Sequence, residues 1–526
     1  MEQPPATPAP VPGAGADPPP GSAGSSPRSV AWWWGRILAG LSCALLLGHL
    51  HRAVAASAIE DPDTPWHLTT GRIIHESGVV PRADTICFTT DGLDLVTVDW
   101  LFDLSAYRLY LTLGWAGPLA LACLAFGLAA LGVCWQLRSR AVGPLAGLAG
   151  LALGLFALEV GYAPRPRVWT YAFLAATAGL LARPDPELRL GAGRAGALAG
   201  LLALWPHVHS GFVYGWALVL CDAAGAVLDR RRAGGRPVPA RSLWLGGACA
   251  ASCLTFLLHP HGWAVPARIV SWAGGSEVFA RTNEMMPLDW REPLAWVVAA
   301  VAAAILAAAL VARRAPPWRE ALPLLPFAVE ALRHRRVVIP LLLVALGPAA
   351  ALWTRAGAGR WLSSRLGPLL LPTWRVMPWA LGLGLATWLA VGVPRRSAPG
   401  IPGQLSAAID PRALPVEAAV FLARSGRSGR VFSPFELGGL LGWVLYPARA
   451  VFIDGRTGFL AHSQVYTSYR QVMDGQPGWQ ETLARWEVVQ AVAPRESALA
   501  PRLMQAGWTR VHEDATFVVL ERPAPR

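Results

Sequence analysis

The chain has 526 residues, of which 54% are hydrophobic and only 15% are charged. This composition excludes an ordinary soluble protein, because so few polar residues cannot cover so much apolar surface. The net charge of +13 would indicate nucleic-acid binding in a soluble protein, but here the arginines separate apolar runs of membrane-spanning length. The sequence therefore predicts an α-helical polytopic membrane protein.

The N-terminal stretch, residues 1–30, is rich in Pro, Ala, Gly and Ser. Such a segment buries too little apolar surface to offset the entropy lost on ordering, so it is expected to be a disordered cytoplasmic tail. The first apolar run, about 37–57, lacks a small-residue cleavage site after a short core. It is expected to stay attached as a membrane anchor and not to be removed as a signal peptide.

Residues 31–394 are expected to form a transmembrane domain of about 11 helices. A helix needs roughly 20 apolar residues to cross the membrane, and each apolar run of about this length predicts one span. The spans after the first are predicted near 113–135, 142–160, 168–182, 195–206, 212–228, 243–258, 295–312, 321–332, 337–353 and 374–393. Arginines cluster in alternate loops, and the positive-inside rule makes that side cytoplasmic. The other loops, and everything after residue 394, are then expected to lie outside the cytoplasm.

The first outer loop, about 58–106, differs from the other loops in its charge. It carries nine of the 33 acidic residues, against only Arg72 and Arg82. The nine are Glu60, Asp61, Asp63, Glu76, Asp84, Asp91, Asp94, Asp99 and Asp103. An anionic outer loop of this kind is a candidate functional site.

The strongest local pattern is EDPDTPWHLTTGRII, residues 60–74. Asp61 and Asp63 stand two residues apart and can converge on one hydroxyl group or one divalent ion. Thr64 is a natural N-cap residue, and the spacing predicts a short interfacial helix from Trp66 to Ser77. The alternative is that both aspartates only cap this helix.

The stretch TVDWLFDLSAYRLY, residues 97–110, places Asp99 and Asp103 one helical turn apart. Its apolar residues fall on the opposite side, so a second short helix is expected to lead into the next span. The two acidic helix ends can face each other across a cleft. The alternative is a solvated polar face.

Two outward turns carry arginine against the positive-inside trend. One is GYAPRPRVW at 161–169, and the other is RHRR at 333–336. Arginine binds phosphate through two hydrogen bonds at once, so these turns predict a site for a lipid phosphate or diphosphate. The residues concerned are Arg165, Arg167, Arg333, Arg335 and Arg336. The alternative is that 321–336 is not a full span, which would leave the second cluster cytoplasmic.

Two His-x-His pairs lie at predicted outer ends of spans, in WPHVHSGF and LHPHGW. Their members are His207, His209, His259 and His261. Four imidazoles can bind zinc in principle, but neutral histidine is also a good hydrogen-bond partner for a hydroxylated substrate. Structural packing is the third interpretation. Substrate lining is preferred to zinc, because no spacing for a third ligand is recognisable.

Residues 395–526 are expected to form a soluble α/β domain, joined by a Pro- and Gly-rich linker near 394–403. Strands are predicted at 430–433, 449–453, 488–492 and 516–521, and helices near 413–424, 462–473, 478–486 and 496–506. The run GRVFSPFELGGLLGWVL followed by RAVFIDGRTGF is expected to be strand, Gly-rich turn, strand and acidic loop. It places Asp454 and Arg456 at the end of a strand, where α/β sheets often bind ligands, although a structural ion pair is the preferred interpretation.

These motifs together resemble those of bacterial polytopic membrane proteins grouped with the GT-C glycosyltransferases. The resemblance covers most of residues 37–522 and rests on DPDTPWHLTTGRII, RPR, LWPHVHSGF, LLHPHG and VFIDGRTGF. It implies transfer of a sugar from a polyprenyl-phosphate-linked donor to an extracytoplasmic glycan, lipid or protein acceptor, with inversion. It also implies that Asp61 or Asp63 is the catalytic carboxylate.

The residues expected to bind substrate are His67, Asp99, Asp103, Arg165, Arg167, His207, His209, His259, His261, Arg333, Arg335 and Arg336. A divalent cation, Mg²⁺ or Mn²⁺, is an optional cofactor at Asp61 and Asp63. The protein is expected in a bacterial inner membrane, with its N-terminus in the cytoplasm and its C-terminal domain outside. The competing hypothesis is a non-catalytic transporter or an assembly partner for envelope polysaccharide.

Overall fold

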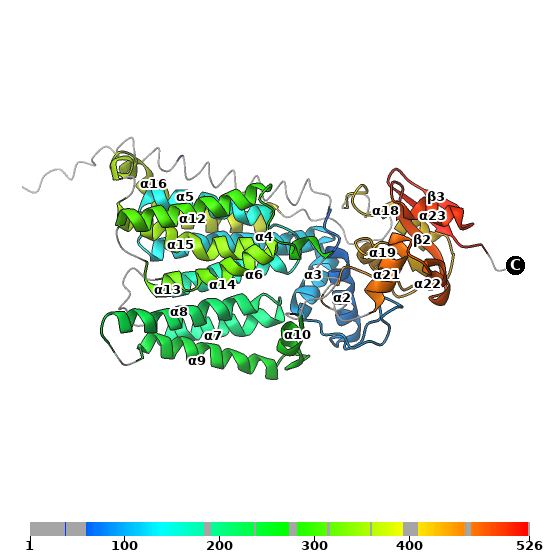
Figure 1. The fold of residues 1–526 in the computed structure, drawn as a ribbon, viewed down its shortest axis with the longest axis horizontal. Coiled ribbons are helices and arrows are strands. Elements are labelled where there is room, and N and C mark those ends of the chain that lie inside the picture. Colours follow the sequence, from blue (N-terminus) through cyan, green and yellow to red (C-terminus); the bar gives the residue numbers. More distant parts are fainter. Residues whose placement is uncertain are drawn as a thin grey trace, which may run out of the picture.

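The structure is a computed structural model that describes residues 37, 59–182, 191–235, 238–272, 281–312, 316–357, 360–392, 409–456, 458 and 464–523. The predicted tail at 1–30 lies outside the described residues, as does the first predicted span apart from Ile37. Among the described residues, the elements as far as residue 392 are helices, and a small sheet with flanking helices follows them (Figure 1).

Every predicted span that the structure describes coincides with helix. The helices are α2 (Thr64–Ser77), α3 (Trp100–Leu113), α4 (Ala116–Ser139), α5 (Pro144–Val160), α6 (Arg167–Leu181), α7 (Ala192–Leu204), α8 (Phe212–Arg232), α9 (Ala240–Ser252), α10 (Ala264–Trp272), α12 (Pro293–Ala312), α13 (Trp318–Ala321), α14 (Leu324–Arg333), α15 (Val338–Ala356) and α16 (Arg360–Thr387). Within the described part of the chain, four helical segments are long and apolar enough to cross a membrane: Ala116–Ser139, Phe212–Arg232, Ala240–Leu257 and Arg335–Ala356.

Two spans differ from their predicted bounds. The predicted span 321–332 is instead two short helices, α13 and α14, with Pro323 at the start of α14. Ten residues are too few to cross about 30 Å of hydrocarbon. Helix α16 begins at Arg360 and not near residue 374, because hydropathy detects only the apolar part of a helix and its first turns carry arginine.

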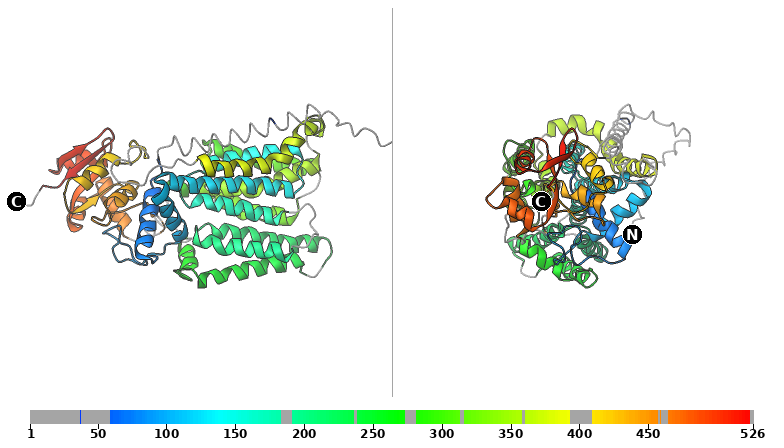
Figure 2. Two further views of the ribbon diagram at one scale, coloured as in Figure 1. Left: turned by 180° about the vertical axis from the view of Figure 1, so that it is seen from behind. Right: turned by 90° about the vertical axis from the view of Figure 1, so that its right-hand side faces the viewer.

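The long helices form two groups that run side by side (Figures 1 and 2). In one group α4 packs against α5, α6 and α15, and α12 packs on α15. In the other, α7, α8 and α9 pack on one another. Helices α2, α3 and α10 lie at the end of the bundle that faces the C-terminal domain.

The C-terminal domain contains a four-stranded sheet in the order β1-β2-β4-β3. Strand β1 (Arg430–Phe432) is parallel to β2 (Val488–Pro494), and β4 (Phe517–Glu521) is antiparallel to β2 and to β3 (Thr509–Glu513). Its helices are α18 (Val416–Arg424), α19 (Gly438–Leu445), α21 (Val465–Asp474), α22 (Trp479–Arg485) and α23 (Leu499–Gln505). The predicted α/β domain is therefore confirmed, but β3 was missed.

The Gly-rich segment of this domain is a helix and not the predicted turn. Gly438 and Gly439 begin α19, and a Cβ on Gly438 would lie 1.8 Å from the carbonyl oxygen of Ile453. A Cβ on Gly439 would lie 2.6 Å from the carbonyl oxygen of Pro62 in the first outer loop. The two glycines are therefore needed for close approach, which brings α19 against the acidic motif.

The predicted strand 449–453 forms only isolated bridges, but these join the domain to the first outer loop. Val451 pairs with Val431 on one side and with Cys87 on the other. Trp443 of α19 packs edge-on against Tyr110 of α3, with ring centroids 5.1 Å apart. The C-terminal domain thus lies directly on the loop that carries the acidic residues.

Candidate functional site

A cavity of about 240 Å³ opens where the first outer loop, the 161–166 turn and the C-terminal domain meet. Its polar lining comes from Asp63, His67, Asp99, Asp103, Arg165, Arg167, His209, Glu284, Arg336 and Arg456. Its apolar lining includes Ile269, Trp272, Met285 and Pro340. The cavity brings together acidic, basic and apolar groups from distant parts of the chain.

The two aspartates of the acidic motif point to different partners. Asp61 Oδ2 accepts hydrogen bonds from the backbone N–H and the hydroxyl of Thr64, at 3.1 and 2.8 Å. Helix α2 begins at Thr64 and not at Trp66, with Asp63 in the cap position. Asp61 thereby satisfies the first free N–H of the helix, which is a capping role. Asp63 lines the cavity, whereas Asp61 does not.

Arg165 connects these aspartates to the far side of the cavity. Its guanidinium contacts Asp63 Oδ2 and lies 3.4 Å from Asp61 Oδ1. On the other side it lies 2.6 Å from Glu284 Oε1, which also pairs with Arg167 at 2.5 Å. Sequence reasoning missed Glu284, because no motif marks it in the sequence.

Two carboxyl groups of the cavity, those of Asp63 and Glu284, have pKa values shifted in opposite directions. Burial raises the pKa of Asp63 to about 6, against the opposing effect of Arg165. Burial acts in the same direction on Glu284, but Arg167 and Arg165 together lower the pKa of that carboxyl to about 2. Glu284 is thus held as a carboxylate, while Asp63 titrates close to neutral pH.

The paired aspartates do not fit a divalent cation in this arrangement. Asp63 Oδ1 accepts a hydrogen bond from Trp66 Nε1 at 3.1 Å, and Asp63 Oδ2 contacts Arg165. Asp61 Oδ1 faces Arg165 and Asp61 Oδ2 accepts from Thr64. All four carboxylate oxygens therefore have a partner, and the cation between the two side chains is the guanidinium.

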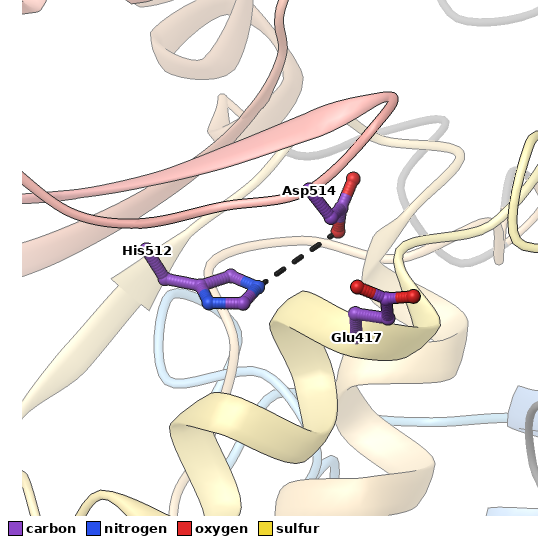
Figure 3. Close-up of side chains that lie close together, drawn as sticks. All are labelled: Glu417, His512 and Asp514. Carbon is purple, nitrogen blue, oxygen red and sulfur yellow. Dashed lines mark ion pairs between the residues drawn. The ribbon is translucent and has the colours of Figure 1, made fainter.

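One group in the described part of the chain has the geometry to hold a metal ion, and it lies away from the cavity. Glu417, His512 and Asp514 each offer a ligand atom within 4.8 Å of the others (Figure 3). The imidazole of His512 stacks on Phe421 at 4.7 Å, and Asp514 Oδ1 accepts two backbone N–H groups in the β3–β4 turn. These contacts give His512 and Asp514 a structural role.

Helices α2 and α3 meet closely at the acidic end of the cavity. A Cβ on Gly71 would lie 2.0 Å from the carbonyl oxygen of Asp103, so only glycine permits this approach. One turn before Gly71, His67 Nδ1 lies 2.6 Å from Asp103 Oδ1. Asp99 stands at the start of α3, and burial raises the pKa of its carboxyl to about 7. The sequence predicted a cleft between the acidic ends of these two helices. In the structure α2 and α3 instead pack directly on each other there, and the cavity lies beside the contact.

Of the four paired histidines, only His209 lines the cavity. Its Nδ1 lies 2.7 Å from the hydroxyl of Thr170. His207 accepts a hydrogen bond from Trp100 Nε1 and packs on His259, with ring centroids 4.9 Å apart. His261 Nε2 accepts the backbone N–H of Thr97 at 3.2 Å. The structure therefore brings three of the histidines together behind the cavity wall.

The predicted arginines also divide into those that line the cavity and those that do not. Arg165, Arg167 and Arg336 line the cavity. Arg335 pairs with Glu292 at 2.9 Å, and Arg333 is 69% exposed on α14. The 333–336 turn thus supplies one cavity residue, Arg336.

Asp454 and Arg456 form the ion pair that the sequence suggested. Arg456 Nε lies 2.8 Å from Asp454 Oδ2, and Arg456 Nη1 lies 2.8 Å from Asp84 Oδ1. All three side chains are buried. Arg456 also lines the cavity, so the C-terminal domain supplies part of its wall.

No family model matches the sequence, and no curated protein matches it. Solved structures do match the fold, and the chain resembles two of them over most of its length. The first is the archaeal oligosaccharyltransferase AglB from Archaeoglobus fulgidus, in complex with an inhibitory peptide and a dolichol-phosphate. It has a TM-score of 0.52 and 10% identity, and the match covers 89% of this chain and 70% of that chain. The second is ArnT from Cupriavidus metallidurans bound to undecaprenyl phosphate, with a TM-score of 0.55 and 15% identity over 94% and 98% of the two chains.

Both structures belong to the GT-C superfamily, so the predicted GT-C-like fold is confirmed. At these identities the likeness concerns the fold alone, and function has to be argued from the site.

Proposed function

We propose that this chain with a GT-C fold is an integral-membrane glycosyltransferase. It moves a sugar from a polyprenyl-phosphate-linked donor to an extracytoplasmic glycan, lipid or protein acceptor, with inversion. The observation that carries the proposal is that Asp63 lines the same cavity as Arg165, Arg167 and Arg336. A carboxylate and a phosphate-binding group are the two chemical parts that such a transfer needs.

The arginines would hold the lipid phosphate. Arg165 and Arg167 both bind the carboxylate of Glu284, which shows that they can converge on one anion. A phosphate would replace Glu284 as their partner and accept paired hydrogen bonds from the guanidinium groups. The same groups would stabilise the negative charge that develops on the leaving phosphate.

Asp63 would take the proton from the acceptor hydroxyl as that oxygen attacks the anomeric carbon. Of the two aspartates in the motif, Asp63 lines the cavity and Asp61 caps α2. A base is most effective when its pKa lies near the working pH, and burial raises that of Asp63 to about 6. One displacement of this kind inverts the configuration of the sugar.

The donor and the chain would share the bilayer. Ile269, Trp272 and Met285 give the cavity an apolar side next to α10, which fits a ligand with a polyprenyl tail. We place the Arg-rich loops in the cytoplasm and the C-terminal domain outside, as the positive-inside rule predicts. The acceptor would then enter from the side of the C-terminal domain.

Our mechanism contains no step through a metal ion. A Mg²⁺ or Mn²⁺ ion at Asp61 and Asp63 would require Arg165 to withdraw from both carboxylates. Transfer is therefore expected to persist when divalent cations are removed by chelation.

The test is transfer of a labelled sugar from a pool of short-chain polyprenyl-phosphate donors by the purified full chain in nanodiscs. Wild-type protein is expected to transfer the sugar, and Asp63→Asn is expected to lower the transfer rate by about 10²–10⁴-fold while lipid-phosphate binding remains. Arg333→Gln is the matched control, because this arginine is exposed outside the cavity. Absence of transfer and of donor binding over a broad panel would reject the proposal in favour of a transport or assembly role.

A further inference from the structure

His67 and Asp103 form a buried pair on the cavity wall that the steps above leave without a role. His67 is 3% exposed and Asp103 is 0% exposed. Because His67 Nδ1 contacts Asp103 Oδ1 at 2.6 Å, Nε2 is the ring nitrogen left for a ligand in the cavity. The ring is fixed from both sides, by Trp66 with centroids 3.6 Å apart and by the edge of Phe102.

Asp103 has the surroundings of a neutral carboxylic acid. Its Oδ2 is buried and has no hydrogen-bond partner among the described residues. An ionised carboxylate with a buried, unpartnered oxygen is costly, and Asp99 one turn away adds like-charge repulsion. Burial and then Asp99 accordingly raise the pKa of Asp103.

The charged groups around His67 oppose a positive imidazolium. Arg165 faces it from the 161–166 turn and His209 from the segment before α8. Arg456 of the C-terminal domain acts on Asp103 in the opposite sense to burial and Asp99, because its charge lowers the pKa of that carboxyl. Asp63 on its own helix is neutralised by Arg165. Burial, Arg165 and His209 together lower the pKa of His67, which favours the neutral imidazole.

We propose that Asp103 is a protonated carboxylic acid that donates to His67 Nδ1 and so holds the imidazole as the tautomer whose Nε2–H donates to the lipid phosphate. The inference rests on the proposed function only for the identity of that phosphate ligand. His67 is then a substrate-binding donor beside Arg165, and Asp103 is a positioning residue. The opposite arrangement, an ionised Asp103 that accepts from Nδ1–H, would leave Nε2 as an acceptor that repels phosphate.

The first experiment detects the proton on Asp103 without any ligand. The infrared C=O band of a protonated, buried carboxyl is expected in the wild-type full chain at neutral pH and is expected to weaken in Asp103→Asn. The exposed Asp91 provides the control, since Asp91→Asn should leave this band unchanged. Identical spectra for wild type and Asp103→Asn would overturn the proposal.

The second experiment measures the affinity for a short-chain polyprenyl phosphate in nanodiscs. His67→Phe removes the donor and is expected to weaken binding about tenfold, the worth of one hydrogen bond to a charged group. His67→Gln keeps an N–H donor and is expected to stay within about threefold of wild type. Wild-type affinity in His67→Phe would overturn the proposal, and His67→Gln serves if the Phe variant does not fold.

A pH series tests the positioning role of Asp103. Affinity is expected to fall at alkaline pH as Asp103 loses its proton and His67 Nε2 becomes an acceptor, and Asp103→Asn is expected to remove this fall. An unchanged profile in Asp103→Asn would contradict the role. Lipid-phosphate binding without sugar transfer would reject the proposed function alone, whereas a wild-type chain that binds no polyprenyl phosphate would reject both.

Discussion

Arg456 Nη1 of the C-terminal domain lies 2.8 Å from Asp84 Oδ1 of the first outer loop. Asp84 is fixed in turn by the backbone N–H groups of Ile86 and Cys87, and Arg456 also pairs with Asp454. The pair joins two segments that are 372 residues apart in the chain. It holds the C-terminal domain against the cavity that Arg456 itself lines.

Replacing this arginine is expected to destabilise the protein strongly. Arg456→Leu leaves Asp84 and Asp454 buried without a cation, which should lower the free energy of unfolding by about 3–5 kcal/mol. Denaturant unfolding of the full chain in detergent measures the change. Arg510→Leu is the control, because Arg510 is exposed on β3 and pairs there with Glu513, so a loss below about 1 kcal/mol is expected. Similar losses in both variants would contradict a structural role for the buried pair.

The two aspartates of the acidic motif are expected to respond differently to the same substitution. Asp63→Asn removes the proposed base and should lower the transfer rate by about 10²–10⁴-fold. Asp61→Asn should retain transfer, since asparagine caps a helix nearly as well as aspartate. Asp61→Ala should lower the free energy of unfolding by about 1 kcal/mol through loss of the cap. Loss of transfer in Asp61→Asn, with Asp63→Asn active, would reverse the assignment.

The pH dependence of transfer is expected to follow Asp63. Burial raises the pKa of this carboxyl to about 6, and it can accept a proton only when ionised. The rate should therefore rise with pH through about 6 and level off near neutral pH, below the alkaline range in which phosphate affinity is expected to fall. Measurements of kcat/KM across this range check the profile. Asp99→Asn should keep the rise, which separates Asp63 from Asp99, whose pKa lies at about 7. A rate that falls over this range would contradict a base role for Asp63.

Contact between the C-terminal domain and Asp63 is expected to matter for transfer. A Cβ on Gly455 would lie 2.4 Å from Asp63 Oδ1, the oxygen that Trp66 Nε1 binds. Gly455→Ala should displace this carboxylate and lower transfer by up to about a hundredfold. The control is Gly246→Ala in α9, where the added Cβ meets no atom within 4 Å, so transfer should be unchanged. Wild-type transfer by Gly455→Ala would show that Asp63 tolerates the shift.

Among the arginines, phosphate affinity is expected to depend on those that line the cavity and not on those outside it. Arg165→Lys replaces a planar guanidinium, which can donate two hydrogen bonds to one phosphate, by a compact ammonium group. The change should weaken binding of a polyprenyl phosphate at least about tenfold. Arg333→Gln should leave the affinity unchanged. The affinity of the wild type should also fall with added salt. Titrations in nanodiscs at two salt concentrations measure both effects, and equal losses for the two variants would argue against a phosphate site at Arg165.

Local patterns predicted the secondary structure well, for physical reasons. The described spans coincide with helices because the length of an apolar run is a property of the sequence. Gly78 ends α2 with a φ of 72°, as expected of a glycine after a helix. Strand β3 was missed because its residues are exposed or only half-buried, so no alternation of apolar and polar residues marks it.

The tertiary contacts could not be predicted in the same way. Arg165 and Asp63 are 102 residues apart, and Glu284 joins them from a third segment with no motif of its own. The histidine pairs look alike in sequence, yet only His209 reaches the cavity.

The sequence by itself predicted which of the described apolar runs form helices, and that the first outer loop is acidic, because each of these depends on the composition of one continuous stretch. Only the tertiary structure decided that Asp61 caps α2 while Asp63 faces the cavity. It likewise decided that α19 reaches the acidic motif through Gly439. Those outcomes depend on which distant surfaces pack together, and packing is a property of the whole fold and not of any single segment.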